Sequence, residues 1–389
     1  MISEKKSNFT DFRVVRELFP ITQTNTYLNA AAIGPLPLPT RQIISELDSA
    51  RADCRMDYDV ERFHHQRARE AIAQLIGAAW EEVALTPNTS WGLTWTAWSL
   101  PLSTGDEVLI PSGEFPAPAY SVLGLKQKGV NVRFIDCRLG LLTPERLKRE
   151  LTPKSKALFI SWVNFKSGVR QPLAELSSVC HQEGMKIVVD GIQGVGGLDC
   201  DVNQLGIDVL ACAGPKWLLS PMGIGFLYVH LPVQKDFSPP SLGWLSVERD
   251  EENPFENLTN YQWKPYEDAR RLEMGTISYI LSGAMATSVN LLCNIGMKRA
   301  EEHILLLNSL IYKELSKLRW QPVLDGTDAK YRSNVAVFKP KDFCRLKEIF
   351  DMEKIVVTLR EGLVRIGAHI YNHEEDVWRL INICNKYSV

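Results

Sequence analysis

The chain has 389 residues, of which 45% are hydrophobic and 23% are charged, so the composition excludes a disordered protein and predicts a large core divided between two domains. Its formal net charge is −2 and it contains no long run of Lys or Arg, which argues against a nucleic-acid partner. No stretch approaches the ~20 apolar residues of a membrane span and the amino terminus lacks an apolar signal region, so we expect a cytoplasmic protein without a membrane partner.

Strands and helices alternate through the first two thirds of the chain, a pattern typical of a mostly parallel sheet covered by helices. In chain order we expect a strand at 108–111, a helix at 116–128, a strand at 132–135, a helix at 144–150, a strand at 157–163, a helix at 173–183, and strands at 186–189, 209–211 and 225–229. We assign these elements to a large domain, residues 26–270, and we assign residues 1–25 to a separate N-terminal segment.

The alternation stops after residue 229. Between residues 232 and 268 the sequence is rich in Pro, Trp, Asn and acidic residues, and this length is too great for an idle connection in a compact domain. We therefore expect a functional or interface loop that shapes the substrate pocket with the aromatic residues Trp244, Tyr261, Trp263 and Tyr266.

A smaller α+β domain is predicted for residues 271–389. Its expected elements are a long helical stretch at 278–318, a strand at 335–339, a helix at 342–350, short strands at 355–359 and 364–366, and a helix at 374–386.

Two charged residues follow consecutive strands of the predicted large sheet. Asp190 ends the strand 186–189, and Lys216 follows the next strand in the sequence Cys-Ala-Gly-Pro-Lys-Trp. A carboxylate can hold a pyridine nitrogen protonated, and a lysine amine can form an imine with an aldehyde. The pair therefore predicts a pyridoxal phosphate (PLP) enzyme, with a turn aspartate and a surface lysine as the alternatives.

Five ordered segments carry motifs that belong together, namely residues 27–37, 188–193, 215–219, 271–276 and 364–372. They resemble the class V aminotransferase family, and the resemblance covers roughly residues 20–388. It implies an α/β protein of PLP-dependent fold type I, like aspartate aminotransferase, with a large, mixed, mostly parallel sheet and a smaller α+β C-terminal domain. It also implies a homodimer with shared active sites and an amino acid as the small-molecule substrate.

The resemblance gives catalytic roles to Lys216, which would form the Schiff base, and to Asp190, which would pair with the ring nitrogen. Gln193 would donate to the ring's phenolic oxygen or to the imine, with helix capping as its alternative. Asn164 would reach the same oxygen, unless it only forms the turn that precedes Lys-Ser-Gly. Phe115 would lie over the cofactor ring, unless it is a core residue.

Donors for the cofactor phosphate are expected in residues 86–93. Small hydroxyl residues there open a predicted helix, whose free N–H groups and dipole attract an anion. Ser90 is the best side-chain candidate, with the amides of Thr89 and Trp91 beside it. Helix capping is the alternative for these residues.

The chain departs from the family pattern near the lysine. Relatives often have Ser or Thr three residues before it and His immediately before it, whereas this chain has Ala213 and Pro215. More of the phosphate binding would then fall on Ser90 and on Thr276, which in the family comes from the neighbouring subunit.

The substrate's α-carboxylate is expected to bind Arg365, because a planar guanidinium contacts two oxygens at once. A solvated strand arginine is the alternative. Arg360 and His369, close by in sequence, either serve the pocket or line the surface of the small domain.

Two features of related enzymes that are missing from this sequence bear on the reaction type, a nucleophilic Cys loop and a His stacked on the cofactor ring. Cysteine desulfurases carry a nucleophilic Cys on a loop just before this arginine, whereas residues 359–365 contain no Cys and leave no room for such a loop. The eight cysteines form no C-x-x-C pair and have no metal-ligand spacing to His, so we expect reduced thiols and no metal. In addition, Phe115 cannot transfer a proton to a leaving thiolate, as a stacked His could.

We therefore expect amino transfer. A β-eliminating carbon–sulfur lyase, similar to cystine or selenocysteine lyases, is the second candidate, and an amino acid epimerase is the third. The alternative outside enzymes is a binding module that retains the fold.

Overall fold

The computed structural model describes residues 11–389 except 56, 249–255, 257–258, 260 and 262–263, so the expected pocket role of Trp263 lies outside the described residues. Within this part of the chain, the large domain contains a seven-stranded sheet of order β2-β8-β7-β6-β5-β3-β4. Pairing is parallel except where β8 meets β2 and β7. The expected mixed, mostly parallel sheet is confirmed. The strands are β2 (Val83–Thr86), β3 (Glu107–Pro111), β4 (Asn131–Ile135), β5 (Ser155–Ser161), β6 (Lys186–Asp190), β7 (Val209–Ala213) and β8 (Gly225–Val229).

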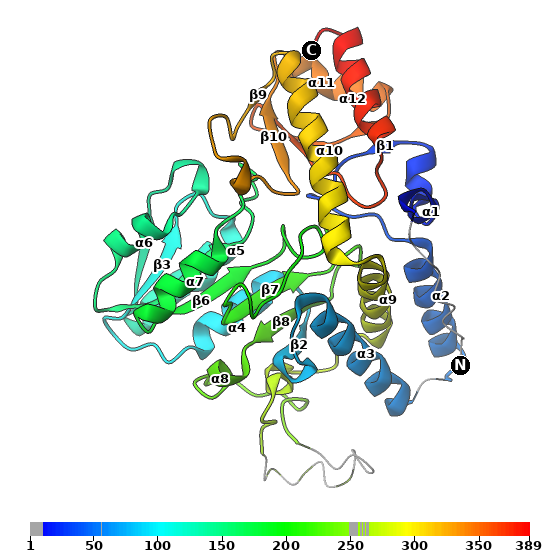
Figure 1. Cartoon of the computed structure of the whole chain (residues 1–389). Helices are drawn as coiled ribbons and strands as arrows, with labels where there is room; N and C mark the ends of the chain where they lie inside the picture. The colour runs from blue at the N-terminus through cyan, green and yellow to red at the C-terminus, as the bar shows by residue number, and fades with distance from the viewer. Residues whose placement is uncertain (1–10, 56, 249–255, 257–258, 260, 262–263) are drawn as a thin grey trace.

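Helices cover both faces of this sheet (Figure 1). In β6, Ile187 and Val189 belong to one apolar core with α3, α7 and α9, whereas Val188 belongs to a second core with α4 and α5. Both faces of the sheet are therefore buried, which explains why the sequences of the central strands are continuous apolar runs. The helices of this part are α2 (Leu38–Ala52), α3 (Tyr58–Ile76), α4 (Thr89–Ser99), α5 (Pro116–Leu123), α6 (Pro144–Glu150), α7 (Leu173–Gln182), α8 (Leu231–Gln234) and α9 (Tyr279–Ile295).

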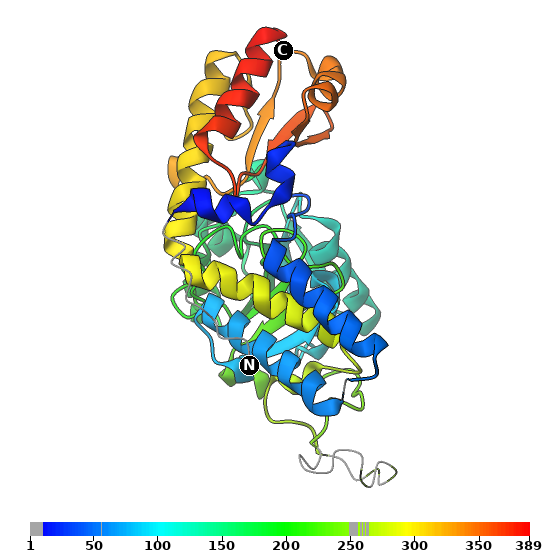
Figure 2. The ribbon, with the colours of Figure 1, turned by 90° about the vertical axis from the view of Figure 1, so that its right-hand side faces the viewer.

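The small domain has a four-stranded antiparallel sheet of order β12-β13-β10-β9 in the described residues. It forms its own apolar core with the helices α10, α11 and α12, and Figure 2 shows this domain at the upper end of the molecule. The expected α+β character is thus observed. Its elements are α10 (Met297–Lys317), β9 (Gln321–Pro322), β10 (Ala336–Lys339), α11 (Phe343–Met352), β11 (Ile355–Val356), β12 (Thr358–Arg360), β13 (Leu363–Ile366) and α12 (Glu374–Lys386).

The helical stretch expected at 278–318 is two helices rather than one. Gly296 separates α9 from α10 with φ of +87°, and the two helix axes meet at 79°. Figure 2 shows the change of direction between the two helices. Glycine adopts positive φ without steric cost, which ends the first helix. Because Met297 and Ala300 at the start of α10 still belong to the core of the large domain, whereas Leu307 belongs to that of the small domain, α10 carries the polypeptide from one domain into the other. The domain boundary at residue 271 stays a prediction.

The described part of the N-terminal segment lies against the small domain (Figure 1). Arg16 of α1 (Phe12–Glu17) forms an ion pair of 2.6 Å with Asp376 of α12. The short strand β1 (Thr26–Tyr27) then pairs in parallel with β11.

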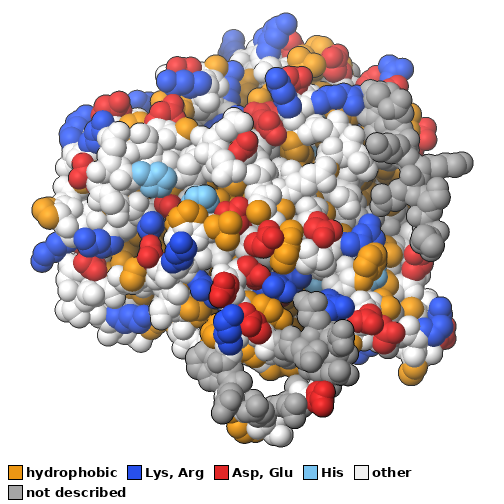
Figure 3. All heavy atoms as spheres, turned by 60° about the horizontal axis from the view of Figure 1, so that its bottom comes forward, with side chains coloured by type: hydrophobic (Ala, Val, Ile, Leu, Met, Phe, Trp, Pro, Cys, Tyr) orange, Lys and Arg blue, Asp and Glu red, His pale blue; other side chains and the backbone are white. Residues whose placement is uncertain are grey.

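The surface charge and the hydrophobicity of the helices agree with the sequence. Acidic and basic side chains are intermixed on the face shown in Figure 3, as expected from the small net charge. Of the helices in the described part of the chain, none alone has the length and apolar content to cross a membrane, and the bent pair α9 and α10 meets that test only jointly.

Candidate active site

Asp190 lies at the carboxyl end of β6 and is only 1% exposed. Its Oδ1 accepts a hydrogen bond of 2.9 Å from the Ile192 amide. Its Oδ2 is buried and has no partner among the described residues. Burial raises the pKa of this carboxyl to about 6. A buried oxygen without a donor is costly, so this atom fits the protonated ring nitrogen of PLP.

Lys216 follows β7, the neighbour of β6 in the sheet. Burial lowers the pKa of its amine to about 8, an effect that the charge of Asp190 opposes and that Arg365 and Arg360 reinforce. Near physiological pH, the fraction of this amine that is neutral is therefore larger than for an ordinary lysine. It can therefore act as a nucleophile or as a base.

The turn that carries Lys216 is held by close backbone contacts. Gly34 donates its N–H to the Pro215 carbonyl at 2.8 Å. A Cβ atom on Gly34 would lie 2.1 Å from the Lys216 carbonyl oxygen, so only glycine fits there. The lysine is thus presented from a fixed backbone.

Gln193 and His369 hold the next residue, Trp217. The Gln193 Oε1 accepts from the Trp217 indole N–H at 3.0 Å, and its Nε2 donates to the Ala31 carbonyl at 3.0 Å. One amide hydrogen is left, so the expected contact of Gln193 with the cofactor stays a prediction. His369 is fully buried and its Nε2 lies 2.9 Å from the Trp217 carbonyl, so it supports the lysine turn rather than lining a surface.

Burial of Lys216 predicts a pH-dependent stability of the cofactor-free protein. Between the folded pKa of about 8 and the ordinary 10.5, the unfolded chain binds a proton that the folded protein lacks, so stability rises with pH in this window. Below the folded pKa, the folded protein bears the full free-energy cost of burying the charged amine. We expect cofactor-free Lys216→Met to exceed wild type by about 3 kcal/mol at neutral pH. Urea unfolding at several pH values in this window should show that the difference in unfolding free energy between the variant and wild type decreases as the pH rises. A difference independent of pH would contradict a buried Lys216 with a lowered pKa.

Phe115 lies on the lysine side of the site. Its ring centroid is 5.9 Å from the Lys216 Nζ, and the ring contacts the Phe165 ring edge-on at 5.2 Å. Phe115 is 38% exposed, although it is a large apolar residue. An exposed ring beside the amine agrees with the expected position over a cofactor, and a core role is excluded.

Asn164 forms a turn, the alternative that the sequence left open. Its Oδ1 accepts from the amides of Lys166 and Ser167, both at 3.0 Å, and its Nδ2 donates to the Gly113 carbonyl at 3.1 Å. The side chain is 3% exposed. Its contact with the cofactor stays a prediction.

Glu114 is a site residue that the sequence reasoning missed. Its carboxylate accepts from the Ser161 amide at 2.8 Å and from the Ser161 hydroxyl. Ser161 is the register partner of Asp190 on the neighbouring strand. Burial raises the pKa of Glu114 to about 7, and the charge of Asp190 contributes. Glu114 thereby fixes the turn that carries Phe115, and an acidic residue just after β3 was the available signal.

The expected phosphate site at the start of α4 differs in detail from the prediction. Asn88 is the capping residue, and its Oδ1 accepts from the Trp91 amide at 2.9 Å, so that amide already has a partner. Ser90 is exposed. The Thr89 hydroxyl is buried and has no partner among the described residues, which makes it a side-chain donor that the sequence reasoning overlooked. The roles of Thr89, Ser90 and Trp91 toward phosphate stay predictions.

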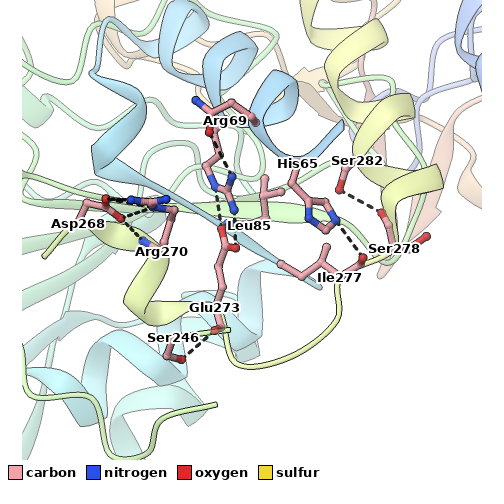
Figure 4. Close-up of polar contacts among 11 residues, drawn as sticks. His65, Arg69, Leu85, Ser246, Asp268, Arg270, Glu273, Ile277, Ser278 and Ser282 are labelled. Carbon is pink, nitrogen blue, oxygen red and sulfur yellow. Dashed lines mark hydrogen bonds and ion pairs between the residues drawn. The ribbon is translucent and has the colours of Figure 1, made fainter. Parts of the chain in front are cut away.

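Thr276 is exposed on a segment that buried contacts hold in place (Figure 4). Arg69 of α3 pairs with Glu273 at 2.6 Å, and both side chains are less than a tenth exposed. Glu273 also accepts from the Leu85 amide at 2.8 Å, and His65 lies 3.0 Å from the Ile277 carbonyl. Breaking one half of such a buried pair typically costs about 3–5 kcal/mol. The role of Thr276 in a neighbouring subunit stays a prediction.

The described part of the 232–268 loop lies at the end of the large domain that is farthest from the small domain (Figure 1). Tyr261 is 83% exposed and Trp244 is 44% exposed, while Tyr266 stacks on Arg270 at 4.0 Å. Their role in a substrate pocket stays a prediction.

Arg365 on β13 faces a small, solvent-open cavity between the two domains. Its guanidinium donates to the Phe165 carbonyl at 3.1 Å and to the Thr358 hydroxyl at 3.3 Å, while its Nε is buried without a partner. It forms no ion pair within the described residues. Burial and the nearby Arg360 lower its pKa to about 10. The cavity is lined by Phe165, Lys166, Val337, Thr358, Arg360, Glu361, Leu363 and Arg365.

A tight turn replaces any loop before Arg365. Glu361 and Gly362 connect β12 to β13 with φ of 51° and 75°, values typical of a two-residue hairpin. None of the eight cysteines lines the cavity, and burial raises the pKa of Cys212, near Lys216 in the chain, well above its usual value. The expectation that no loop fits at 359–365 is confirmed.

The lysine, the unpaired carboxylate oxygen and the exposed ring therefore fit PLP, and the arginine fits a carboxylate. The Aminotransferase class-V family model matches residues 55–380. A probable cysteine desulfurase from Methanothermobacter thermautotrophicus is 25% identical over 93% of this chain and 94% of its own. Isopenicillin N epimerase from Amycolatopsis lactamdurans is 26% identical over 96% and 98%.

Solved structures show the same fold. The apo cysteine desulfurase from Thermococcus onnurineus NA1 superposes with a TM-score of 0.85 at 23% identity, covering 96% of this chain and 97% of that chain. Fold type I is therefore confirmed. Because the family model spans most of the chain, this protein belongs to the class V aminotransferase family and takes pyridoxal 5'-phosphate as its cofactor.

Proposed function

We propose that this protein is a PLP-dependent lyase that eliminates a substituent from Cβ of an amino acid. The observation that carries the proposal is the buried Lys216 amine, which lies 5.9 Å from the exposed Phe115 ring and whose pKa, near 8, responds to the charges of Asp190 and Arg365. Bound PLP supplies an electron sink that stabilises negative charge at the substrate's Cα. Lys216 would remove the Cα proton, Asp190 would keep the ring nitrogen protonated, and Arg365 would hold the α-carboxylate.

Elimination is favoured over the amino transfer that we expected from the sequence. The archaeal relative is named a probable cysteine desulfurase, an activity that breaks a carbon–sulfur bond, and it matches nearly the whole chain. Because no cysteine lines the cavity, a departing sulfur would leave in solution rather than on a protein thiol.

Amino transfer is the second candidate, and Phe115 favours it. A phenyl ring cannot protonate a leaving thiolate, whereas amino transfer has no leaving group to protonate and would need one group that removes the Cα proton as a base and then delivers it to the cofactor as an acid. Lys216 is placed to do this in either reaction.

The test incubates the PLP-loaded enzyme with L-cysteine, L-cystine and β-chloro-L-alanine. Elimination predicts pyruvate and ammonia in step with substrate loss. Pyridoxamine phosphate without pyruvate would overturn the proposal in favour of amino transfer, and inversion at Cα without either product would overturn it in favour of an epimerase. Chiral chromatography and absorbance spectra separate these outcomes.

A further inference from the structure

Two arginines face the same cavity from one side of the β12–β13 hairpin. The register pairs Thr358 with Arg365 and Arg360 with Leu363. Side chains alternate between the two faces of a strand, so these four residues share a face, and all four line the cavity. Arg360 and Arg365 are diagonal neighbours, whose Cα atoms are typically ~7–8 Å apart.

The cavity carries excess positive charge. Lys166 is paired with Glu361 at 2.6 Å, which neutralises both. Arg365 contacts only a carbonyl and a hydroxyl, and Arg360, whose side chain is exposed, has neither a hydrogen bond nor an ion pair to any described residue. Two guanidinium groups therefore face one cavity whose acidic lining residue, Glu361, already pairs with Lys166, an arrangement that an anionic ligand would stabilise.

We propose that the substrate is an amino acid with a second acidic group on a short side chain, which Arg360 binds while Arg365 binds the α-carboxylate. This inference rests on the proposed function, because it concerns the substrate of the same site. Because elimination needs a substituent that leaves Cβ with its electron pair, the chemical class is amino acids with an anionic leaving group at Cβ, such as a phosphate or sulfate ester. Aspartate and its sulfinate analogue fit the same two arginines as ligands only, since their acidic groups would depart as CO2 or SO2 and leave the electron pair on carbon. A guanidinium matches the planar oxygen pair of such groups, and Phe165, Val337 and Leu363 provide apolar contact for a short stem.

Binding of acids that cannot react tests this directly. In calorimetric titrations of the PLP-loaded protein, succinate should bind ~10-fold more tightly than butyrate, which has one carboxylate fewer and the same number of carbons, a difference of ~1.4 kcal/mol. In Arg360→Met, the preference for succinate should disappear. Equal binding of the two acids to wild type, or an unchanged preference in this variant, would overturn the proposal.

Two further variants sharpen the result. Glu361→Gln removes the one acidic residue of the cavity, so it should increase the preference for succinate. Lys339→Met removes an exposed positive charge on β10 that does not line the cavity, so it should leave the preference unchanged. An altered preference in Lys339→Met would assign the effect to general charge and overturn a specific role of Arg360. Because this test measures binding and not turnover, the preference for succinate can be absent although elimination is observed. It can equally be present although elimination is not observed.

Discussion

Replacing Lys216 with Ala should reduce turnover of any substrate by about 10³- to 10⁴-fold, because one amine serves both as the covalent anchor of the cofactor and as the base at Cα. The burial that lowers its pKa, together with the fixed turn around Gly34, places this amine for both tasks. Steady-state kinetics on the substrate found in the product assay measures the effect.

Folding must be separated from chemistry in this experiment. Circular dichroism and urea unfolding of Lys216→Ala should show a folded protein, since removing a buried amine relieves a desolvation cost. An exposed lysine of the large domain, Lys128, gives the matched control, and Lys128→Ala should retain wild-type turnover. A Lys216→Ala protein as active as wild type would contradict the assignment and support a binding module.

Replacing Asp190 with Asn should reduce kcat/KM by about 10²- to 10³-fold, because the substitution removes the charge while nearly preserving the shape. The Asn side-chain oxygen can still accept from the Ile192 amide, so the turn stays intact. What is lost is the buried anion opposite the ring nitrogen, and with it the ring's capacity to withdraw electrons.

The absorbance of the bound cofactor provides a second readout for Asp190→Asn. The variant should still bind PLP through Lys216, with a visible spectrum that responds differently to pH. Asp351→Asn, at an exposed helical ion pair, is the control that should behave like wild type. Wild-type kcat/KM in Asp190→Asn would show that this carboxylate does not serve the ring nitrogen.

Much of the large sheet could be predicted because burial on both faces gives its strands an apolar signature, as in β6 and β8. The four-residue strand β2 carries too short a pattern to be distinguished from its surroundings, and its place depends on antiparallel pairing with β8. Similarly, the break between α9 and α10 required recognising one glycine, Gly296, within a continuous helical pattern.

Within the site, Lys216, Asp190 and Arg365 could be predicted because their chemistry is specific and each follows or lies in a recognisable strand. The acidic residue after β3 was visible in the sequence, but the contact of Glu114 with Ser161 could not be predicted, since the two are 47 residues apart and only strand pairing brings them together. One side of the cavity between the two domains could be predicted, because the spacing of Arg360 and Arg365 around the Glu361–Gly362 turn already places them on one face of the hairpin.

The most direct test of the central claim is borohydride reduction of the protein after reconstitution with PLP, followed by mass spectrometry of its peptides. The account predicts that a reduced pyridoxyl group is attached to Lys216 and that Lys216→Ala carries none. Attachment to another lysine, or a colourless protein with no attachment, would contradict it.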